Sequence, residues 1–187
     1  MCGIAGWIDW TRDLTNEGRT LKNMTDAIEH RGPDAEGSWL KGHAALGHRR
    51  LIVIDPNGGK QPMLYQNGKN TIALTYNGEL YNYLELRKEL TERNHQFTTS
   101  SDTEVLLHAY LEWGEDCVRH FNGIFAFGIW DEEKERLMLG RDHLGVKPLF
   151  YTIKEDQVLF GSEIKALLAH PEVQAEIDTE GLSEVFG

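Results

Sequence analysis

A cysteine directly after the initiator methionine is the residue with the clearest chemical potential in this chain, which begins Met1-Cys2-Gly3. Cysteine is small enough for Met1 to be removed, and removal would leave Cys2 with both a thiol and a free α-amine. The thiol becomes a good nucleophile once its proton leaves. An α-amine with a pKa of roughly 7.7–8.0 is partly unprotonated at neutral pH. One residue could therefore supply a nucleophile and its base, although position 2 alone does not establish a catalyst.

Most other chemistries have no matching pattern in the chain. The sequence contains no GxxxxGK[ST] or GxGxxG loop, no GxSxG elbow, and no HExxH or CxxC motif. Its eight histidines lack ligand spacing, so no metal site is predicted. A Cys–His dyad, with Cys117 as nucleophile and His30, His48 or His143 as base, is an alternative. Cys117 lies in a predicted helical segment, however, where a buried structural thiol is favoured.

Length and charge restrict the class of protein. With 187 residues, the chain has room for one domain with a substantial core. Its formal net charge of −11 disfavours nucleic-acid and anionic-membrane binding. The sequence has no apolar run of about 20 residues and no signal peptide. Its two cysteines do not indicate a disulfide scaffold, so a cytoplasmic location is expected.

Regular elements must hold such a nucleophile in place. Residues 3–10 are predicted to form a buried strand that starts at Cys2 and keeps it rigid. Further strands are predicted at 36–40, 44–54, 71–76, 124–130, 136–141, 149–153 and 157–161. Helices are predicted at 17–30, 80–93, 104–113 and 163–169, and 178–187 begins another helical pattern. Apolar strands mixed with amphipathic helices favour layered sheets covered by helices.

The Asn77-Gly78 pair is predicted to join a strand to a helix. Asn-Gly usually marks a tight hairpin turn, but a helical pattern follows it here. A strand-to-helix junction would leave backbone N–H groups available to a ligand.

Seven motifs occur in one order: MCGIAGW at the N-terminus, HRGPD at 30–34, HRRL at 48–51, YNGELYN at 76–82, SDTEVLL at 101–107, GRDHLGVKPLFY at 140–151 and SEIKALL at 162–168. Together they resemble the glutaminase domain of class II glutamine amidotransferases, which are N-terminal-nucleophile hydrolases. The last two motifs favour the glutamine-hydrolysing asparagine synthetases within that class. The resemblance extends from Met1 to about Leu168.

The resemblance implies an α+β fold, a four-layer αββα sandwich of two mainly antiparallel sheets covered by helices. It implies a single glutaminase domain over residues 1–187. Residues from about 170 to 187 would begin a linker or helix toward a missing C-terminal synthetase domain. The SGGxDS phosphate-binding motif of that synthetase domain does not occur in this chain.

The resemblance also assigns catalytic roles by matching positions. Cys2, once freed of Met1, corresponds to the nucleophile that attacks the side-chain amide of glutamine. The side-chain amide of Asn77 and the backbone N–H of Gly78 correspond to the oxyanion hole. Fixed donors there would meet the negative charge that develops on oxygen.

Substrate-binding roles follow in the same way. Arg50 matches the residue that binds the α-carboxylate of glutamine, and a planar guanidinium suits paired charge-assisted bonds. Strand alternation would point the neighbouring Arg49 to the opposite face. Glu79 and Asp102 match the carboxylates that hold the α-ammonium group. The backbone of the stretch Leu51–Val53, which includes Ile52, is expected to line the pocket. Structural roles are expected for the other charged motif residues, His30, Arg31, Asp34, Arg141, Asp142 and Lys147.

The implied reaction is hydrolysis of glutamine to glutamate and ammonia through a γ-glutamyl thioester on Cys2. Ammonia would pass through a channel to the synthetase domain, which amidates aspartate with ATP and Mg²⁺. No cofactor or metal is expected in the glutaminase domain itself. The expected partners are L-glutamine and the synthetase domain, with neither nucleic acid nor membrane, and the full-length enzyme could form a homodimer.

Two alternatives stay open. The missing half could amidate a carboxylate other than free aspartate. The domain could also be a non-catalytic regulatory module on the same fold, which would require a retained Met1 or a broken oxyanion hole.

Overall fold

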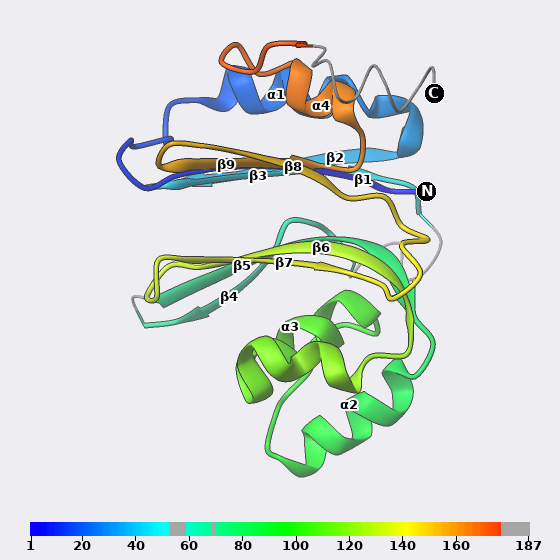
Figure 1. The fold of residues 1–187 in the computed structure, drawn as a ribbon. Coiled ribbons are helices and arrows are strands. Elements are labelled where there is room, and N and C mark those ends of the chain that lie inside the picture. The colour runs from blue at the N-terminus through cyan, green and yellow to red at the C-terminus, as the bar shows by residue number, and fades with distance from the viewer. Residues whose placement is uncertain (53–58, 69, 177–187) are drawn as a thin grey trace.

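Two β-sheets lie face to face between two layers of helices in the computed structural model, which describes residues 1–52, 59–68 and 70–176 (Figure 1). One helical layer consists of α1 (Gly18–Asp26) and α4 (Ile164–Leu168), and the other of α2 (Tyr83–Glu92) and α3 (Asp102–Trp113). Short 3-10 helices occur at Glu29–Arg31 and Gly114–His120. This arrangement confirms the predicted α+β sandwich.

The first sheet is antiparallel and has the strand order β2-β3-β1-β9-β8. Its strands are β1 (Gly3–Asp9), β2 (Ala35–Lys41), β3 (Ala44–Arg50), β8 (Phe150–Lys154) and β9 (Gln157–Gly161). The central strand β1 is buried over its whole length. Cys2 therefore precedes the most enclosed strand of this sheet, which keeps the N-terminus from fraying.

The second sheet is also antiparallel, with the order β4-β5-β6-β7. Its strands are β4 (Met63–Asn67), β5 (Asn70–Leu80), β6 (Gly123–Asp131) and β7 (Arg136–Arg141). The long strand β5 extends beyond its neighbour β4, because the ladder between them ends at the pair of Met63 and Leu74. One edge of β5 is thus without β4 from Thr75 onward.

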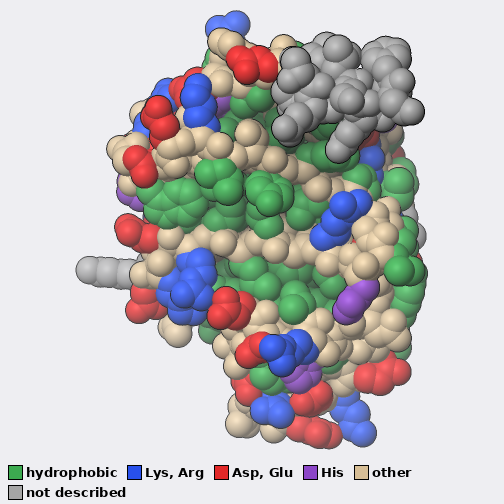
Figure 2. All heavy atoms as spheres, in the orientation of Figure 1, with side chains coloured by type: hydrophobic (Ala, Val, Ile, Leu, Met, Phe, Trp, Pro, Cys, Tyr) green, Lys and Arg blue, Asp and Glu red, His purple; other side chains and the backbone are tan. Residues whose placement is uncertain are grey.

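The two sheets contact each other through a core that includes Phe160 of β9 and Trp130 of β6. The Phe160 ring lies against Gly6 of β1 and Gly128 of β6, and a Cβ added at either glycine would collide with it. Glycine is needed at both positions because the ring occupies the space of a side chain. Figure 2 shows hydrophobic side chains gathered on the side of the molecule where the edge strands of the two sheets, β8 and β7, lie.

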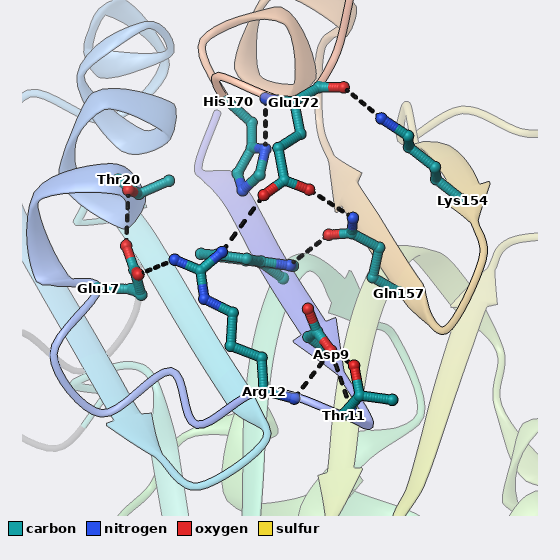
Figure 3. Close-up of polar contacts among 10 residues, drawn as sticks. Asp9, Thr11, Arg12, Glu17, Thr20, Lys154, Gln157, His170 and Glu172 are labelled. Carbon is teal, nitrogen blue, oxygen red and sulfur yellow. Dashed lines mark hydrogen bonds and ion pairs between the residues drawn. The ribbon is translucent and has the colours of Figure 1, made fainter.

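The far end of β1 is held by a polar network that also binds His170 and Glu172 (Figure 3). Gln157 accepts a hydrogen bond from Trp7 Nε1 at 2.9 Å and donates one to Glu172 at 2.6 Å. Arg12 forms ion pairs with Glu172 and Glu17. These contacts lie at the opposite end of β1 from Cys2, so they anchor the strand without entering the cavity.

The prediction of a strand-to-helix junction at Asn77-Gly78 is wrong. β5 continues through both residues to Leu80, and they pair with Ala126 and Phe125 of β6. A Cβ at Gly78 would lie 2.5 Å from the backbone oxygen of Ile124. Glycine therefore lets the two strands approach closely here, and tertiary pairing overrides the turn preference of Asn-Gly.

Other elements differ from the predictions mainly at their ends. The strand predicted over 44–54 ends at Arg50, and residues 53 and 54 lie outside the described residues, as does the helical pattern at 178–187. The helix predicted over 80–93 begins at Tyr83, and the one over 17–30 divides into α1 and a 3-10 turn. Strand β4 was not predicted.

Candidate active site

A cavity of about 180 Å³ lies where β1 begins and where β3 and β5 end. In Figure 1 the N-terminus marks this end of the first sheet. The cavity is lined by Met1, Cys2, Arg50, Leu51, Gly59, Gln61, Tyr76, Asn77, Gly78, Glu79, Ser101, Asp102, Thr103 and Lys147. Residues far apart in the sequence therefore meet at a single site, and six of the seven predicted site residues are among them.

Cys2 is half-buried and held from two sides. Its Sγ lies 3.4 Å from the backbone nitrogen of Leu51 and 3.6 Å from the carbonyl oxygen of the same residue. Arg31 Nε donates a hydrogen bond to the Cys2 carbonyl at 3.0 Å. The thiol is thus positioned at the cavity by backbone groups of Leu51, while Arg31 fixes the backbone behind it.

Arg31 is itself held by Glu163, which lies just before α4. Glu163 Oε1 accepts from Arg31 Nη1 at 2.9 Å and lies 3.0 Å from His30 Nε2, and Lys165 is 3.1 Å from Oε2. Partial burial alone would raise the pKa of Glu163, but hydrogen bonds from Arg31, Lys165 and His30 lower it to about 2. These contacts agree with the structural roles expected for His30 and Arg31.

The Glu163 cluster predicts a specific loss of stability in acid. The folded-state pKa lies below the ordinary value of 4.5, so the contribution is complete above pH 4.5 and declines as the pH falls toward 2. We expect Glu163→Gln to lower the unfolding free energy by about 1 kcal/mol at pH 7, because the cluster is partly solvent-screened. The difference from wild type should vanish near pH 2 in denaturant titrations. Glu92→Gln on the exposed side of α2 is the control, and an equal effect there would contradict the assignment.

The two residues predicted to form the oxyanion hole, Asn77 and Gly78, lie in β5. Asn77 is 2% exposed, and its Nδ2 has no hydrogen-bond partner among the residues that the structure describes. The amides of Tyr76 and Leu80 both point to the edge that β4 does not cover, since they donate to Gln61 and Asp102. Backbone N–H groups alternate in direction along a strand, so the Gly78 N–H points to the same edge. Asn77 and Gly78 thus present two donors at the cavity.

The charged residues lie around these donors. Asp102, at the first position of α3, accepts from the Tyr76 hydroxyl at 2.8 Å and from the Leu80 amide at 3.1 Å. Burial raises the pKa of Asp102, while these two hydrogen bonds oppose the shift. Arg50 ends β3 and is buried, and Glu79 is exposed at the rim. With Lys147, which also lines the cavity, the lining therefore combines two basic side chains with two carboxylates.

Strand alternation separates Arg49 from Arg50, as predicted. Arg49 Nε donates to the carbonyl of Thr25 in α1, and its guanidinium pairs with Asp26 and Glu36. It therefore faces the helical layer, away from the cavity that Arg50 lines.

Ile52 is not among the residues that line the cavity. Its backbone N–H donates to Asp34 Oδ2 at 2.9 Å, and its side chain is 38% exposed. Leu51, in the same predicted stretch, does line the cavity and provides the backbone contacts to Cys2. Asp34 is thus a structural residue that holds the segment after β3.

The alternative Cys–His dyad is not supported. Cys117 is fully buried, and burial raises the pKa of its thiol to about 12. Burial also lowers the pKa of His48 to about 3, and its Nδ1 lies 3.3 Å from the Thr75 hydroxyl. A protonated buried thiol and a histidine directed at a threonine do not form a nucleophile and base.

Three residues at the cavity carry contacts that sequence reasoning missed. Tyr76 and Gln61 form hydrogen bonds at the edge of β5, although Tyr76 belongs to a motif and Gln61 lies in a turn-rich loop. Lys147 was expected to have a structural role, and its backbone is bound within the loop, where its N–H donates to Asp142 and its carbonyl accepts from Arg141. Its ammonium lies 3.3 Å from the sulfur of Met1 at the cavity. Strand register, which the sequence does not display, brings Gln61 to Tyr76.

Among the described residues, no group of three or more His, Cys, Asp or Glu side chains is placed to hold a metal ion. No helix within the same ranges is long and apolar enough to cross a membrane.

Comparisons with known proteins agree with this geometry. The chain is 55% identical over 187 residues to asparagine synthetase [glutamine-hydrolyzing] 3 of Bacillus subtilis, covering all of this chain and 30% of that protein. It is 40% identical over 169 residues to asparagine synthetase B [glutamine-hydrolyzing] of Escherichia coli, covering 90% of this chain and 30% of that protein. The chain thus spans about 30% of the length of these relatives.

A solved structure shares the fold. The glutamine phosphoribosylpyrophosphate amidotransferase of B. subtilis superposes with a TM-score of 0.75 at 23% identity, covering 90% of this chain and 43% of that one. The glutamine amidotransferase domain family matches residues 1–187, which is the whole chain. Because this family matches the whole chain, the chain belongs to the family of glutamine amidotransferase domains.

Proposed function

We propose that this domain hydrolyses the side-chain amide of L-glutamine with Cys2 as the nucleophile. The observation that carries the proposal is the placement of the Cys2 thiol in one cavity with Asn77, whose Nδ2 has no hydrogen-bond partner within residues 1–52, 59–68 and 70–176. A buried donor without a partner is costly in the free protein. Such a cost is understandable if the donor serves a charge that exists only during the reaction.

The proposed reaction has two stages. With Met1 removed, the α-amine takes the thiol proton while sulfur attacks the amide carbon, and Asn77 and Gly78 donate to the oxyanion. The carbon–nitrogen bond then breaks, the leaving nitrogen takes the proton as ammonia departs, and a γ-glutamyl thioester remains. Water, activated by the same amine, cleaves the thioester, which releases glutamate and restores the thiol.

The charged residues support recognition of an amino acid. Arg50 would bind the α-carboxylate, and Asp102 and Glu79 would bind the α-ammonium group. The Tyr76 and Leu80 donors both bind Oδ2 of Asp102, so neither of them occupies Oδ1. Opposite charges in the same cavity as the thiol would favour glutamine over simple amides, which lack the α-carboxylate and α-ammonium groups.

In a longer protein the ammonia would serve a linked synthetase domain. The relatives named above are glutamine-hydrolysing asparagine synthetases, and about 70% of their length lies outside the match. We therefore propose ATP- and Mg²⁺-dependent amidation of aspartate in that further part of the protein, with no cofactor in the domain described here. A cytoplasmic location is proposed on the same relationship.

A glutamine-like diazoketone tests the nucleophile directly. After incubation with the processed chain, peptide mapping is expected to find one label, on Cys2, with loss of glutaminase activity in proportion to labelling. Excess glutamine should protect against it. Label on Cys117 alone, or activity that survives complete labelling of Cys2, would refute the proposal.

Arg50→Ala is expected to raise the KM for glutamine about 100-fold while lowering kcat less than tenfold. A charge-assisted pair with the α-carboxylate is made in both the ground state and the transition state, so its loss weakens binding uniformly. Steady-state kinetics give both values. Arg49→Ala, which removes the neighbouring cation on the other face, should leave KM within about threefold if the mutant folds, and an unchanged KM for Arg50→Ala would exclude the carboxylate role.

A further inference from the structure

The end of the β4–β5 ladder is formed by a side chain. Met63 pairs with Leu74 in antiparallel register, so two steps further along both strands place Gln61 opposite Tyr76. Pro62 lies between and has no N–H to donate to the ladder. The side-chain amide of Gln61 makes the two bonds that a backbone would make, accepting from Tyr76 N at 2.6 Å and donating to Tyr76 O at 3.0 Å.

A primary amide can replace a peptide group here because it carries the same carbonyl acceptor and N–H donor. The side-chain amide differs from a backbone strand because it can pair with one residue only. A backbone strand would continue along β5 and cover the next outward N–H, which belongs to Gly78. The side chain of Gln61 completes the pairing of Tyr76 and stops before Gly78.

The position of Gln61 is also constrained from the other sheet. Its carbonyl oxygen occupies the space that a Cβ on Gly37 of β2 would need. Gln61 therefore lies between β2 of the first sheet and β5 of the second, beside the cavity that it helps to line. The residue joins the sheet that carries Cys2 to the strand that carries Asn77 and Gly78.

We propose that Gln61 is a positioning residue for the oxyanion donors, which locks Tyr76 so that Asn77 and Gly78 hold their register while the Gly78 N–H stays open to substrate. This inference rests on the proposed function and deepens it, since Gln61 acts through β5 rather than by touching the reacting atoms. It predicts an effect on the chemical step rather than on glutamine binding.

The test uses the Met1-processed chain and three variants. Gln61→Leu removes both bonds to Tyr76. Gln61→Glu keeps the shape and the acceptor but, when ionised, cannot donate to the Tyr76 carbonyl. Gln66→Leu, on the exposed part of β4, is the matched control. The measurements are kcat and KM for glutamine, and amide hydrogen exchange at Tyr76.

We expect Gln61→Leu to lower kcat 10- to 100-fold with KM within about threefold, and to speed exchange at Tyr76 at least tenfold. Gln66→Leu should change neither. The activity of Gln61→Glu relative to wild type should rise as the pH falls from 7 toward 5, because protonation of the carboxyl group, with an ordinary pKa of about 4.3, restores a donor. A purely structural role would not produce this pH signature.

Several results would overturn the inference. A Gln61→Leu kcat within twofold of wild type would show that β5 keeps its register unaided, and a large rise in KM alone would make Gln61 a substrate-binding residue. Unchanged amide exchange at Tyr76 in Gln61→Leu would show that the Gln61 side chain does not protect the Tyr76 N–H. Failure of the proposed function gives a different result: the processed wild-type chain would lack glutaminase activity, but amide exchange at Tyr76 would still differ between Gln61→Leu and wild type. In that case the catalytic part of the inference would also be wrong.

Discussion

The Cys2→Ala chain, freed of Met1, is expected to release glutamate from glutamine at least about 10⁴-fold more slowly than the wild type. Alanine keeps the free α-amine and permits the same removal of Met1, so only the nucleophile is lost. The donors of β5 would still face the cavity, but no thioester could form. The measurement is glutamate production by chains whose N-terminus has been verified by intact mass.

Two controls separate the roles of thiol and amine. Cys117→Ala should keep its activity, because that thiol is buried with a pKa raised to about 12. A chain that retains Met1, through one lysine inserted before Cys2, should be inactive although its Cys2 thiol still reacts with iodoacetamide. The Cys2 nitrogen is then an amide without a basic lone pair, and added residues occupy the cavity that Met1 already lines. Full activity in either Cys2→Ala or the retained chain would contradict the proposed mechanism.

Strand periodicity predicted much of the scaffold. Eight of the nine strands among the described residues were predicted, β4 being the exception. Alternation along β3 correctly predicted that Arg49 and Arg50 point to opposite faces, Arg49 toward the helical layer and Arg50 toward the cavity. The motif positions also brought Cys2, Asn77 and Asp102 together. Local pattern and global fold agree here, as expected of a sequence with few conflicting preferences.

The differences arise where tertiary contacts decide. Asn77 and Gly78 have poor strand preference, yet pairing with β6 and close approach to Ile124 keep them in β5. Gln61 could not be singled out from a loop rich in glycine and proline, because its function depends on the register between Met63 and Leu74. Its ability to act as a strand end becomes visible only in three dimensions.

Asn77→Ala is expected to lower kcat by about 10²- to 10³-fold while leaving the stability of the domain nearly unchanged. Loss of one oxyanion donor raises the barrier by roughly 3–4 kcal/mol. In the free protein the Asn77 Nδ2 is buried and unpartnered among the described residues. Removing an unsatisfied donor relieves a cost of about 1–3 kcal/mol, which offsets the small void left by the side chain.

This pairing of a large kinetic loss with little loss of stability distinguishes Asn77 from a structural asparagine. Denaturant unfolding of the Asn77→Ala chain should give a free energy within about 1 kcal/mol of wild type, whereas loss of a satisfied buried hydrogen bond would lower it further. Thr75→Ala is the matched control two residues earlier, since the Thr75 hydroxyl donates to the Gly47 carbonyl at 3.1 Å. That change should reduce stability and spare kcat. Were Asn77→Ala instead to unfold readily and keep its turnover, Asn77 would hold the strand rather than the oxyanion.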